Sequence, residues 1–444
     1  MSTTIAAIAT APGIAGLAVV RISGDDALSI SDKLFKGKKS LSEFDSHTIH
    51  YGKFFRNDGS LLDTVTASIF KNPNSYTGED TIEFGCHGGF ITANEIVKEL
   101  IKAGATTPTP GEFTKRAFLN GKLDLTQVEA VADIIHSVSI PGSAAAARQL
   151  EGNFKDKLKE FRKNLLQTAG LLELELDFSE EDLELVPKKE ILTRIIDAKK
   201  FCQNLIDSFV GSTILRSGFQ IGIVGYPNSG KSTLFNTLAG KNRAIVSDIA
   251  GTTRDYIEEF IYINNIPFKI VDTAGIRESN DVIEIEGIKL VESILQKSEL
   301  ILVINDINQG ENNSEELFHK LKEKYNNVHL IQNKIDLNNI DTEHISISAK
   351  NNTGIENLKD LFYQTAKNSI ERVNDALINE RQKSLLEQII VNLDNASESL
   401  NLEMENELIA IDLRTAIKII GEITGEAWNE EILAAIFSDF CIGK

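Results

Sequence analysis

A glycine-rich stretch follows an apolar run and reads Gly225-Tyr-Pro-Asn-Ser-Gly-Lys231-Ser232. The run before it is Gln220-Ile-Gly-Ile-Val224, and a helical pattern continues from Ser232 to Leu238. A loop of this kind between strand and helix turns backbone N–H groups toward phosphate oxygens, and the helix N-terminus adds positive potential. Lys231 can neutralise the β- and γ-phosphates, and the Ser232 hydroxyl is available to Mg²⁺. An ordinary glycine-rich turn is the alternative, but this context favours a phosphate-binding loop.

Strand and helix patterns alternate on both sides of this loop, from residue 219 to about residue 368. The apolar runs are Phe219–Val224, Phe268–Val271, Leu300–Ile304, Val328–Gln332 and His344–Ile347. Strands separated by helices predict a doubly wound parallel sheet. We therefore expect an α/β P-loop domain of the Ras-like type over residues 216–370.

Two motifs after later strands predict a guanine nucleotide as the ligand. In Asp272-Thr-Ala-Gly275, the carboxylate can hold Mg²⁺ through a water and the Gly275 N–H can contact the γ-phosphate. In Gln332-Asn333-Lys334-Ile335-Asp336, the Asp336 carboxylate can accept hydrogen bonds from guanine N1–H and the 2-amino group. Adenine lacks that amino group and would leave the carboxylate unpaired. Asn333 and Lys334 would frame the base.

Ser348-Ala349-Lys350 follows the last strand and can offer a main-chain N–H to the same base. Each motif alone also occurs in polar loops, but all of them in this order predict a GTP site. The expected nucleotide-binding residues are Asn228, Ser229, Gly230, Lys231, Ser232, Thr233, Ser247, Asp248, Ile249, Ala250, Gly251, Thr252, Thr253, Asp272, Thr273, Ala274, Gly275, Asn333, Lys334, Asp336, Ser348, Ala349 and Lys350.

The segment Gly251-Thr252-Thr253-Arg254-Asp255 lies where a switch loop is expected. A threonine hydroxyl there can complete the Mg²⁺ shell, with Thr253 preferred over Thr252. Ras-like enzymes place a water-orienting Gln directly after Asp-x-x-Gly, but this chain has Ile276 at that position. The residue that orients the attacking water must therefore come from elsewhere.

The composition sets the broader class of protein. The chain has 444 residues, which favours two to four domains, with 42% hydrophobic and 25% charged residues. Three separated cysteines (Cys86, Cys202, Cys441) fit a reducing compartment and exclude a disulfide framework. The net charge of -19 counts against nucleic-acid binding through a broad basic face. With no membrane-length apolar run and no basic N-terminal flank, we expect a cytoplasmic protein without a membrane segment.

The flanking segments have their own patterns. Residues 1–118 mix short strands with Gly/Pro turns and predict a small α+β domain. Residues 119–215 and 371–444 carry helical spacings of apolar residues. Helix before and after an α/β unit predicts that the nucleotide domain is inserted into a discontinuous helical domain.

Further segments resemble a known family. The phosphate loop, Asp248-Ile-Ala-Gly-Thr-Thr-Arg-Asp255 and Asp272-Thr-Ala-Gly-Ile-Arg277 resemble the TrmE–Era–EngA group of GTPases. The family is narrowed to the MnmE (TrmE) tRNA-modification GTPases by stretches outside that domain: Val20-Arg-Ile-Ser-Gly24, Ser75-Tyr-Thr-Gly-Glu-Asp80, Cys86-His-Gly-Gly89, Gly111-Glu-Phe-Thr-Lys-Arg-Ala-Phe-Leu-Asn-Gly-Lys-Leu-Asp-Leu125 and the C-x-G-K ending Cys441-Ile-Gly-Lys444. This resemblance covers the whole chain.

The resemblance implies a homodimer joined through folate-binding-like N-terminal domains, and a heterotetramer with the flavoprotein MnmG (GidA). It implies K⁺-dependent GTP hydrolysis coupled to installing a 5-carboxymethylaminomethyl group on the wobble uridine, position 34, of certain tRNAs. The one-carbon unit would come from 5-formyl- or 5,10-methylene-tetrahydrofolate. A ribosome-assembly GTPase, or a regulatory switch without a role in tRNA modification, is the alternative.

Residue roles are carried over by position. The K⁺ ligands fall on Asn228, Ser247, Ile249 and Thr252, and the Mg²⁺ ligands remain Ser232 and Thr253. The water-orienting glutamate falls on Glu284, with Glu286 the alternative. The folate-binding positions are Arg21, Glu79, Lys122 and Lys444. Cys441 is either a nucleophile toward the base or a tolerated tail thiol.

Overall fold

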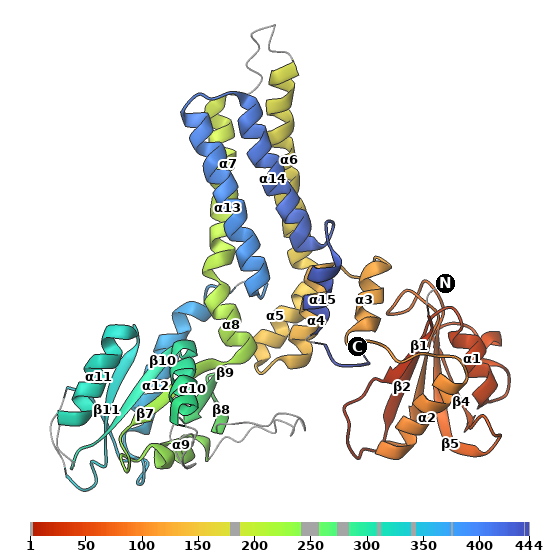
Figure 1. Ribbon diagram of the computed structural model, residues 1–444, viewed down its shortest axis with the longest axis horizontal. Helices are drawn as coiled ribbons and strands as arrows, with labels where there is room; N and C mark the ends of the chain where they lie inside the picture. The colour runs from red at the N-terminus through yellow and green to blue at the C-terminus, as the bar shows by residue number, and fades with distance from the viewer. Residues whose placement is uncertain are drawn as a thin grey trace. The chain divides into compact units, whose positions relative to one another are not determined.

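The computed structural model describes residues 3–177, 187–240, 257–272, 284–308, 312–338, 343–373, 376–438 and 440–443. The chain divides into two compact units, Figure 1. One comprises Met1–Ala132, Lys155–Lys159 and Ile417–Lys444, and the other comprises Asp133–Phe154 and Glu160–Ala416. Among the described residues, no helix is long and apolar enough to cross a membrane.

The first unit contains an antiparallel sheet of six strands in the order β1-β2-β6-β5-β4-β3. The strands are β1 Ile5–Ile8, β2 Ala18–Ser23, β3 Phe35–Lys36, β4 Thr48–Phe55, β5 Leu61–Phe70 and β6 Thr81–Cys86. Helices α1 (Ala27–Leu34) and α2 (Phe90–Lys102) pack on one face. The alternation of side chains along β2 accounts for this packing. Ala18, Val20 and Ile22 are buried beneath the two helices, while Arg21, between Val20 and Ile22 in the sequence, faces the other side of the sheet.

The C-terminal segment of the chain packs within this first unit. Helix α3 (Glu112–Leu119) is followed by α4 (Leu125–His136), and α15 (Glu430–Ser438) contacts α3. Gly111 begins α3 with φ of 68°, and a Cβ there would lie 2.8 Å from the Phe437 ring. Phe118 and Trp428 meet edge to face with ring centroids 6.0 Å apart. These contacts hold residues 428–443 against the N-terminal domain.

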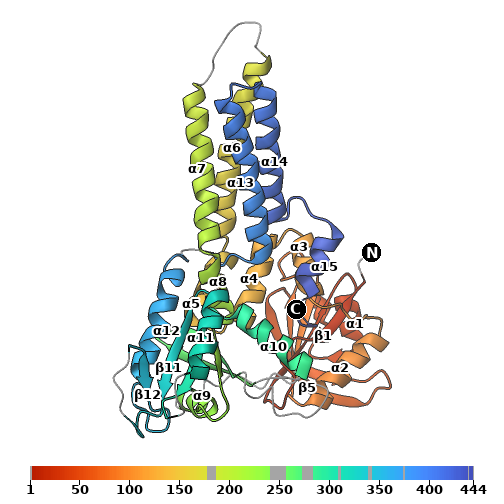
Figure 2. The same ribbon diagram turned by 60° about the vertical axis from the view of Figure 1, so that its left-hand side comes forward.

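The helical part of the second unit is built on a bundle of long helices, two of which also contribute residues to the first unit. They are α6 (Asn153–Asp177), α7 (Lys188–Asp207), α13 (Glu380–Asn401) and α14 (Asn406–Thr424), which run side by side in Figure 2. Shorter helices α5 (Ile140–Leu150) and α8 (Phe209–Ser217) follow at one end. Apolar residues spaced three and four apart on α7 (Ile191, Ile195, Ala198) pack against the corresponding stripe of α13. A capping box between Asn379 and Gln382 fixes the start of α13.

The nucleotide domain is a six-stranded sheet in the order β12-β11-β10-β7-β9-β8. Its strands are β7 Phe219–Gly225, β8 Ile257–Ile263, β9 Ile266–Asp272, β10 Leu300–Asp306, β11 Val328–Asn333 and β12 Ile345–Ile347. Its helices are α9 Lys231–Ala239, α10 Glu284–Lys297, α11 Asn312–Lys324 and α12 Ile355–Ile370. All seven residues of the central strand β10 are buried.

The five predicted strands all form, and they pair in parallel. The sixth strand, β8, was not predicted and is antiparallel to β9 at the edge of the sheet. The predicted insertion is confirmed, because the entry and exit of the domain lie together. Arg216, just before β7, donates hydrogen bonds to the carbonyl oxygens of Leu377 (3.1 Å) and Ile378 (3.3 Å), just before α13.

Candidate functional site

The glycine-rich loop between β7 and α9 has the geometry of a phosphate cradle. Gly230, at the N-cap of α9, has φ of 95°, and a Cβ there would lie 2.2 Å from the amide nitrogen of Asn333. Only glycine fits this position without displacing Asn333. Lys231 follows, with its side chain bent over the loop so that Nζ donates to the Tyr226 carbonyl at 2.8 Å. A phosphate placed at this helix N-terminus would meet main-chain N–H groups and a positive charge.

A hydroxyl and a carboxylate from neighbouring elements lie beside the loop. Ser232 Oγ is 3.4 Å from Asp272 Oδ2, at the end of β9. Asp272 is 3% exposed, so its carboxylate is fixed toward the loop rather than toward bulk water. Hard oxygen donors of this kind suit Mg²⁺, which prefers carboxylate, hydroxyl, phosphate and water ligands. Ser232, predicted to bind Mg²⁺ directly, and Asp272, predicted to hold it through a water, therefore lie next to each other.

Asn333 joins three of the predicted motifs through its side-chain amide. Its Nδ2 donates to the Ser229 carbonyl at 2.9 Å, which connects it to the phosphate loop. Its Oδ1 accepts from the main-chain N–H groups of Lys334 at 2.9 Å and Ala349 at 3.1 Å. Asn333 is 2% exposed. One buried amide thus holds the phosphate loop and both expected base-contacting loops in register.

Asp336, the carboxylate predicted to recognise the base, lies on the exposed side of these loops. Asp336 is exposed, and its Oδ1 accepts a hydrogen bond from Ser348 Oγ at 2.6 Å. The Ala349 carbonyl accepts from Thr237 of α9 at 2.8 Å, which ties the last motif to the helix that follows the phosphate loop. A base bound here would meet a carboxylate already oriented by a neighbouring hydroxyl.

Lys334 connects the base loop to the phosphate loop a second time. Its Nζ donates to the Asn228 carbonyl at 2.8 Å and to Asp306 Oδ2 at 2.6 Å. Burial opposes ionisation of Asp306, but hydrogen bonds from Lys334 and Asn308 outweigh it and hold the pKa of this carboxyl below its usual range. Asp306 was not predicted. The sequence signal that could have found it is an acidic residue at the end of a strand whose first five residues are apolar.

A cavity of about 710 Å³ opens over the phosphate loop. Lys231, Ser232, Thr233 and Lys334 line its polar part, and Val291, Leu295, Leu317 and Leu321 of α10 and α11 line its apolar part. Several predicted residues lie outside the described ranges: Ser247, Asp248, Ile249, Ala250, Gly251, Thr252, Thr253, Thr273, Ala274 and Gly275. Glu284 is the first residue of α10, but its side chain and that of Glu286 are not described.

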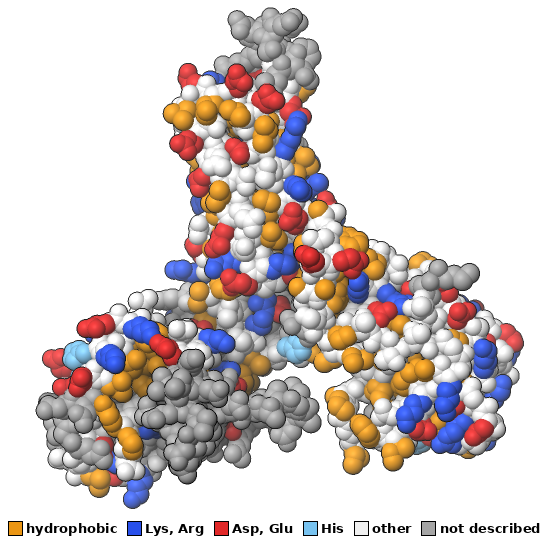
Figure 3. All heavy atoms as spheres, viewed as in Figure 1, with side chains coloured by type: hydrophobic (Ala, Val, Ile, Leu, Met, Phe, Trp, Pro, Cys, Tyr) orange, Lys and Arg blue, Asp and Glu red, His pale blue; other side chains and the backbone are white. Residues whose placement is uncertain are grey.

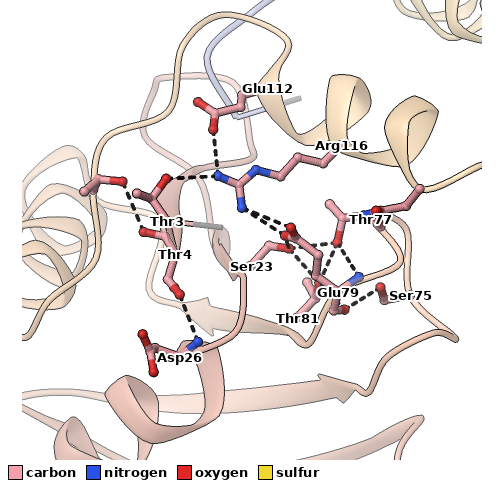
Figure 4. Close-up of polar contacts among 12 residues, drawn as sticks. Thr3, Thr4, Ser23, Asp26, Ser75, Thr77, Glu79, Thr81, Glu112 and Arg116 are labelled. Atoms are coloured by element: carbon pink, nitrogen blue, oxygen red, sulfur yellow. Dashed lines mark hydrogen bonds and ion pairs between the residues drawn. The ribbon is translucent and has the colours of Figure 1, made fainter. Parts of the chain in front are cut away.

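A second polar cluster lies in the N-terminal domain, Figure 4. Glu79 is 9% exposed, and its two carboxylate oxygens accept from Arg116 Nη1 at 3.2 and 3.0 Å. Ser23 Oγ donates to Glu79 Oε2 at 2.9 Å. Arg116 Nη2 also donates to Glu112 at 2.7 Å. Glu79 was a predicted site residue, whereas Arg116, which neutralises it, was not.

Arg21 lies on the face of the sheet away from α1 and α2. Its Nε donates to Glu83 at 2.8 Å, and its guanidinium carbon is 5.4 Å from the Tyr76 ring centroid and 5.5 Å from that of Phe113. Its Nη1 is buried without a hydrogen-bond partner among the described residues. Lys122 is exposed, and a Cβ on Gly78 would lie 3.4 Å from its Cε, next to Glu79. Lys444 is outside the described residues.

Comparison with known proteins decides the family. Residues 4–122 match the model for the GTP-binding protein TrmE N-terminus, and residues 125–441 match the model for the MnmE helical domain. The tRNA modification GTPase MnmE of Acetivibrio thermocellus is 39% identical over 99% of both chains. The chain belongs to the MnmE family of tRNA modification GTPases. MnmE proteins of Christiangramia forsetii (40% identical over the whole of both chains) and Clostridioides difficile (39%, 99% of both) agree.

The predicted MnmE family and its GTPase activity in tRNA modification are therefore confirmed. Among solved structures, Era of Aquifex aeolicus bound to GDP and AlF₄⁻ is 28% identical over 33% of this chain and 56% of that chain, with a TM-score of 0.28. At that TM-score the structural likeness adds nothing to the assignment. The function rests on the full-length MnmE relatives and on the site geometry.

Proposed function

We propose that this protein is a K⁺-dependent GTPase that acts with the flavoprotein MnmG to install the 5-carboxymethylaminomethyl group on the wobble uridine of certain tRNAs. The observation that carries the proposal is the junction at Asn333, which joins the phosphate loop to both base-contacting loops. Such a junction gives the nucleotide a preformed site. The full-length similarity to tRNA modification GTPases supports the pathway.

Two cations belong to the proposed mechanism. Mg²⁺ would take the Ser232 hydroxyl, with Asp272 acting through water and Thr253 closing the shell. K⁺ would take Asn228 in the phosphate loop, with Ser247, Ile249 and Thr252 as the other ligands. Asn228 is an exposed residue of the phosphate loop with φ of 64°, and its main-chain carbonyl accepts from Lys334, which fixes this residue beside the expected phosphates. A monovalent cation there would neutralise charge that develops between the β- and γ-phosphates.

Replacement of K⁺ by Na⁺ tests the cation proposal. We expect GTP turnover to fall in Na⁺, and we expect Asn228→Ala to remove the difference between the two salts. Nucleotide affinity should change little in the same buffers, because Lys231 and the loop N–H groups hold the phosphates. Equal turnover by the wild-type protein in the two salts would reject K⁺ dependence and leave GTP hydrolysis itself standing.

A tetrahydrofolate derivative, 5-formyl or 5,10-methylene, is the proposed ligand of the N-terminal domain. The unpaired, buried Nη1 of Arg21 supports a ligand with a hydrogen-bond acceptor there, and the Glu79 carboxylate suits the amino group of a pterin ring. Lys122 and Lys444 would serve the glutamate tail. Calorimetric titration with 5-formyl-tetrahydrofolate should detect binding that Arg21→Ala weakens and Arg56→Ala leaves intact. Arg56 is the control because its side chain donates to Ser60 and to the Leu61 carbonyl of its own hairpin.

Homodimerisation through the N-terminal domain is the proposed assembly. Large apolar side chains are exposed near the start of α2: Ile14 is 99% exposed, Leu17 58%, Phe90 66% and Ile91 76%. Figure 3 shows hydrophobic side chains gathered on this unit. An exposed apolar cluster favours association. In sedimentation velocity, Ile14→Asp should shift the protein toward monomer, whereas Leu402→Asp, on an exposed residue of the helical bundle, should not. A wild-type monomer at micromolar concentration would contradict the dimer.

Reconstitution with MnmG, tRNA, GTP and a tetrahydrofolate tests the proposed reaction. Formation of the modified uridine only when this protein, MnmG and the tetrahydrofolate are all present would support the proposal. An unmodified tRNA in a reaction that still hydrolyses GTP would reject the proposed roles of MnmG and the tetrahydrofolate and leave the GTPase activity standing.

A further inference from the structure

The Lys334 ammonium is fixed between two groups that lie far apart in the sequence. Its Nζ donates to the Asn228 carbonyl of the phosphate loop and to Asp306 Oδ2 at the end of β10. Lys334 has φ of 68°, so the chain turns sharply at this residue and directs its side chain back toward the phosphate loop. The strength of the contact with Asn228 therefore depends on what holds the other side of the ammonium.

Asp306 is itself held rigidly. It is the last residue of β10 and pairs in register with Asn333, the residue before Lys334. Its Oδ1 accepts from the main-chain N–H and the side-chain amide of Asn308, both at 3.1 Å, which leaves Oδ2 directed toward Lys334. The Asp306 side chain is 6% exposed and that of Lys334 is 30% exposed, so solvent weakens this ion pair less than one on the surface.

We propose that Asp306 is a positioning residue for nucleotide binding: it holds the Lys334 ammonium on the Asn228 carbonyl and so keeps the base loop and the phosphate loop closed together. The effect of Asp306 is on how long the nucleotide stays bound. It does not touch the nucleotide and does not distinguish one purine from another. Base selectivity is instead assigned to Asp336, whose carboxylate would accept from the guanine 2-amino group.

Under this proposal Asp306 sets how fast the nucleotide is released, and Asp336 sets how well guanine is distinguished from other purines. IDP lacks the 2-amino group but has the same phosphates and ribose. Loss of the Asp306 contact should accelerate the release of GDP and IDP by the same factor. A change at Asp336 should instead alter the ratio of the two release rates. General loosening of the domain would lower its thermal midpoint, so that midpoint is measured alongside.

The test uses Asp306→Asn in the full-length protein. The amide carbonyl can still accept from Asn308, which turns the amide NH₂ toward the Lys334 ammonium and removes its anchor. Release of fluorescent GDP and IDP analogues, measured by stopped-flow displacement, should accelerate by about tenfold for both. Glu292→Gln is the matched control, because Glu292 pairs with Lys324 on the exposed surface of the same domain and should leave release unchanged.

A second pair of variants tests whether Asp306 acts through Lys334. In a Lys334→Met protein the ammonium is gone, so adding Asp306→Asn should produce no further acceleration. The proposal is overturned if Asp306→Asn releases GDP at the wild-type rate. It is also overturned if the two nucleotides respond by different factors, or if the same acceleration persists without Lys334.

Discussion

Replacing Asn333 with alanine removes the amide that joins the three loops of the nucleotide site. The Ser229 carbonyl and the Ala349 N–H lose their partner, and both residues are 2% exposed. A buried main-chain group left without a hydrogen bond costs about 1–3 kcal/mol, so the two together cost about 2–6 kcal/mol. The Lys334 N–H also loses its partner, but it lies on a partly exposed residue and adds less.

Part of this cost is avoidable in the nucleotide-free protein, since the loops can separate and admit water. Binding then has to bring them back together, and the cost appears as weaker affinity. The lower bound of about 2 kcal/mol corresponds to roughly a 30-fold weaker affinity, so we expect the Kd for GDP to rise by at least that factor. Fluorescence titration with a labelled GDP at fixed Mg²⁺ measures it. Asn327→Ala is the control, because Asn327 is an exposed residue just before β11 whose amide donates to the Glu299 carbonyl at 3.0 Å and not to a residue of the nucleotide site. A Kd within threefold of wild type, or an equal loss in Asn327→Ala, would show that the Asn333 amide does not hold the nucleotide site together.

Two further predictions concern glutamates. Glu284→Ala should remove most single-turnover GTP hydrolysis with little change in GTP affinity, whereas Glu286→Ala should be mild; the reverse pattern would reassign the water-orienting role. Burial raises the pKa of Glu299 from 4.5 to about 7, although the Gln220 N–H bond opposes it. The protonated form therefore stabilises the fold fully below pH 4.5, and up to about 3 kcal/mol of that contribution is lost as the pH rises through 7. Glu299→Gln should show a smaller drop in unfolding midpoint between pH 5 and pH 8 than wild type, and an equal drop would contradict the assignment.

The strands of the nucleotide domain were predictable because most of them are buried on both faces. A strand such as β10 then appears as a continuous apolar run, which is a strong local signal. Strand β8 was missed because it is an edge strand that pairs with only one neighbour. Its sequence, Ile257-Glu-Glu-Phe-Ile-Tyr-Ile263, has two charged residues near its start. The two-residue turn Asn264-Asn265, with φ of 50° and 65°, joins it to β9 and was a hairpin signal that the prediction did not use.

The motifs of the nucleotide site were predictable for a related reason. Each is a short run directly after a strand, and the carboxyl ends of parallel strands meet at one edge of the sheet. Asp306 and Arg116 carry no such pattern. Asp306 meets a partner 28 residues away and Arg116 meets one 37 residues away, and neither distance follows from local periodicity. Arg21 and Glu79 were predicted only through the family resemblance, since isolated charged residues otherwise indicate a solvated surface.

Asp336→Asn tests whether the Asp336 carboxylate selects guanine over other purines. The carboxylate accepts two hydrogen bonds from guanine, whereas an amide offers one donor and one acceptor, which suits the carbonyl at position 2 of xanthine. Hydrolysis of GTP and XTP by the two proteins is compared at equal Mg²⁺ and K⁺. We expect the variant to lose GTP hydrolysis at low substrate concentration and to gain XTP hydrolysis. A variant that still hydrolyses GTP like wild type and ignores XTP would contradict this role of Asp336.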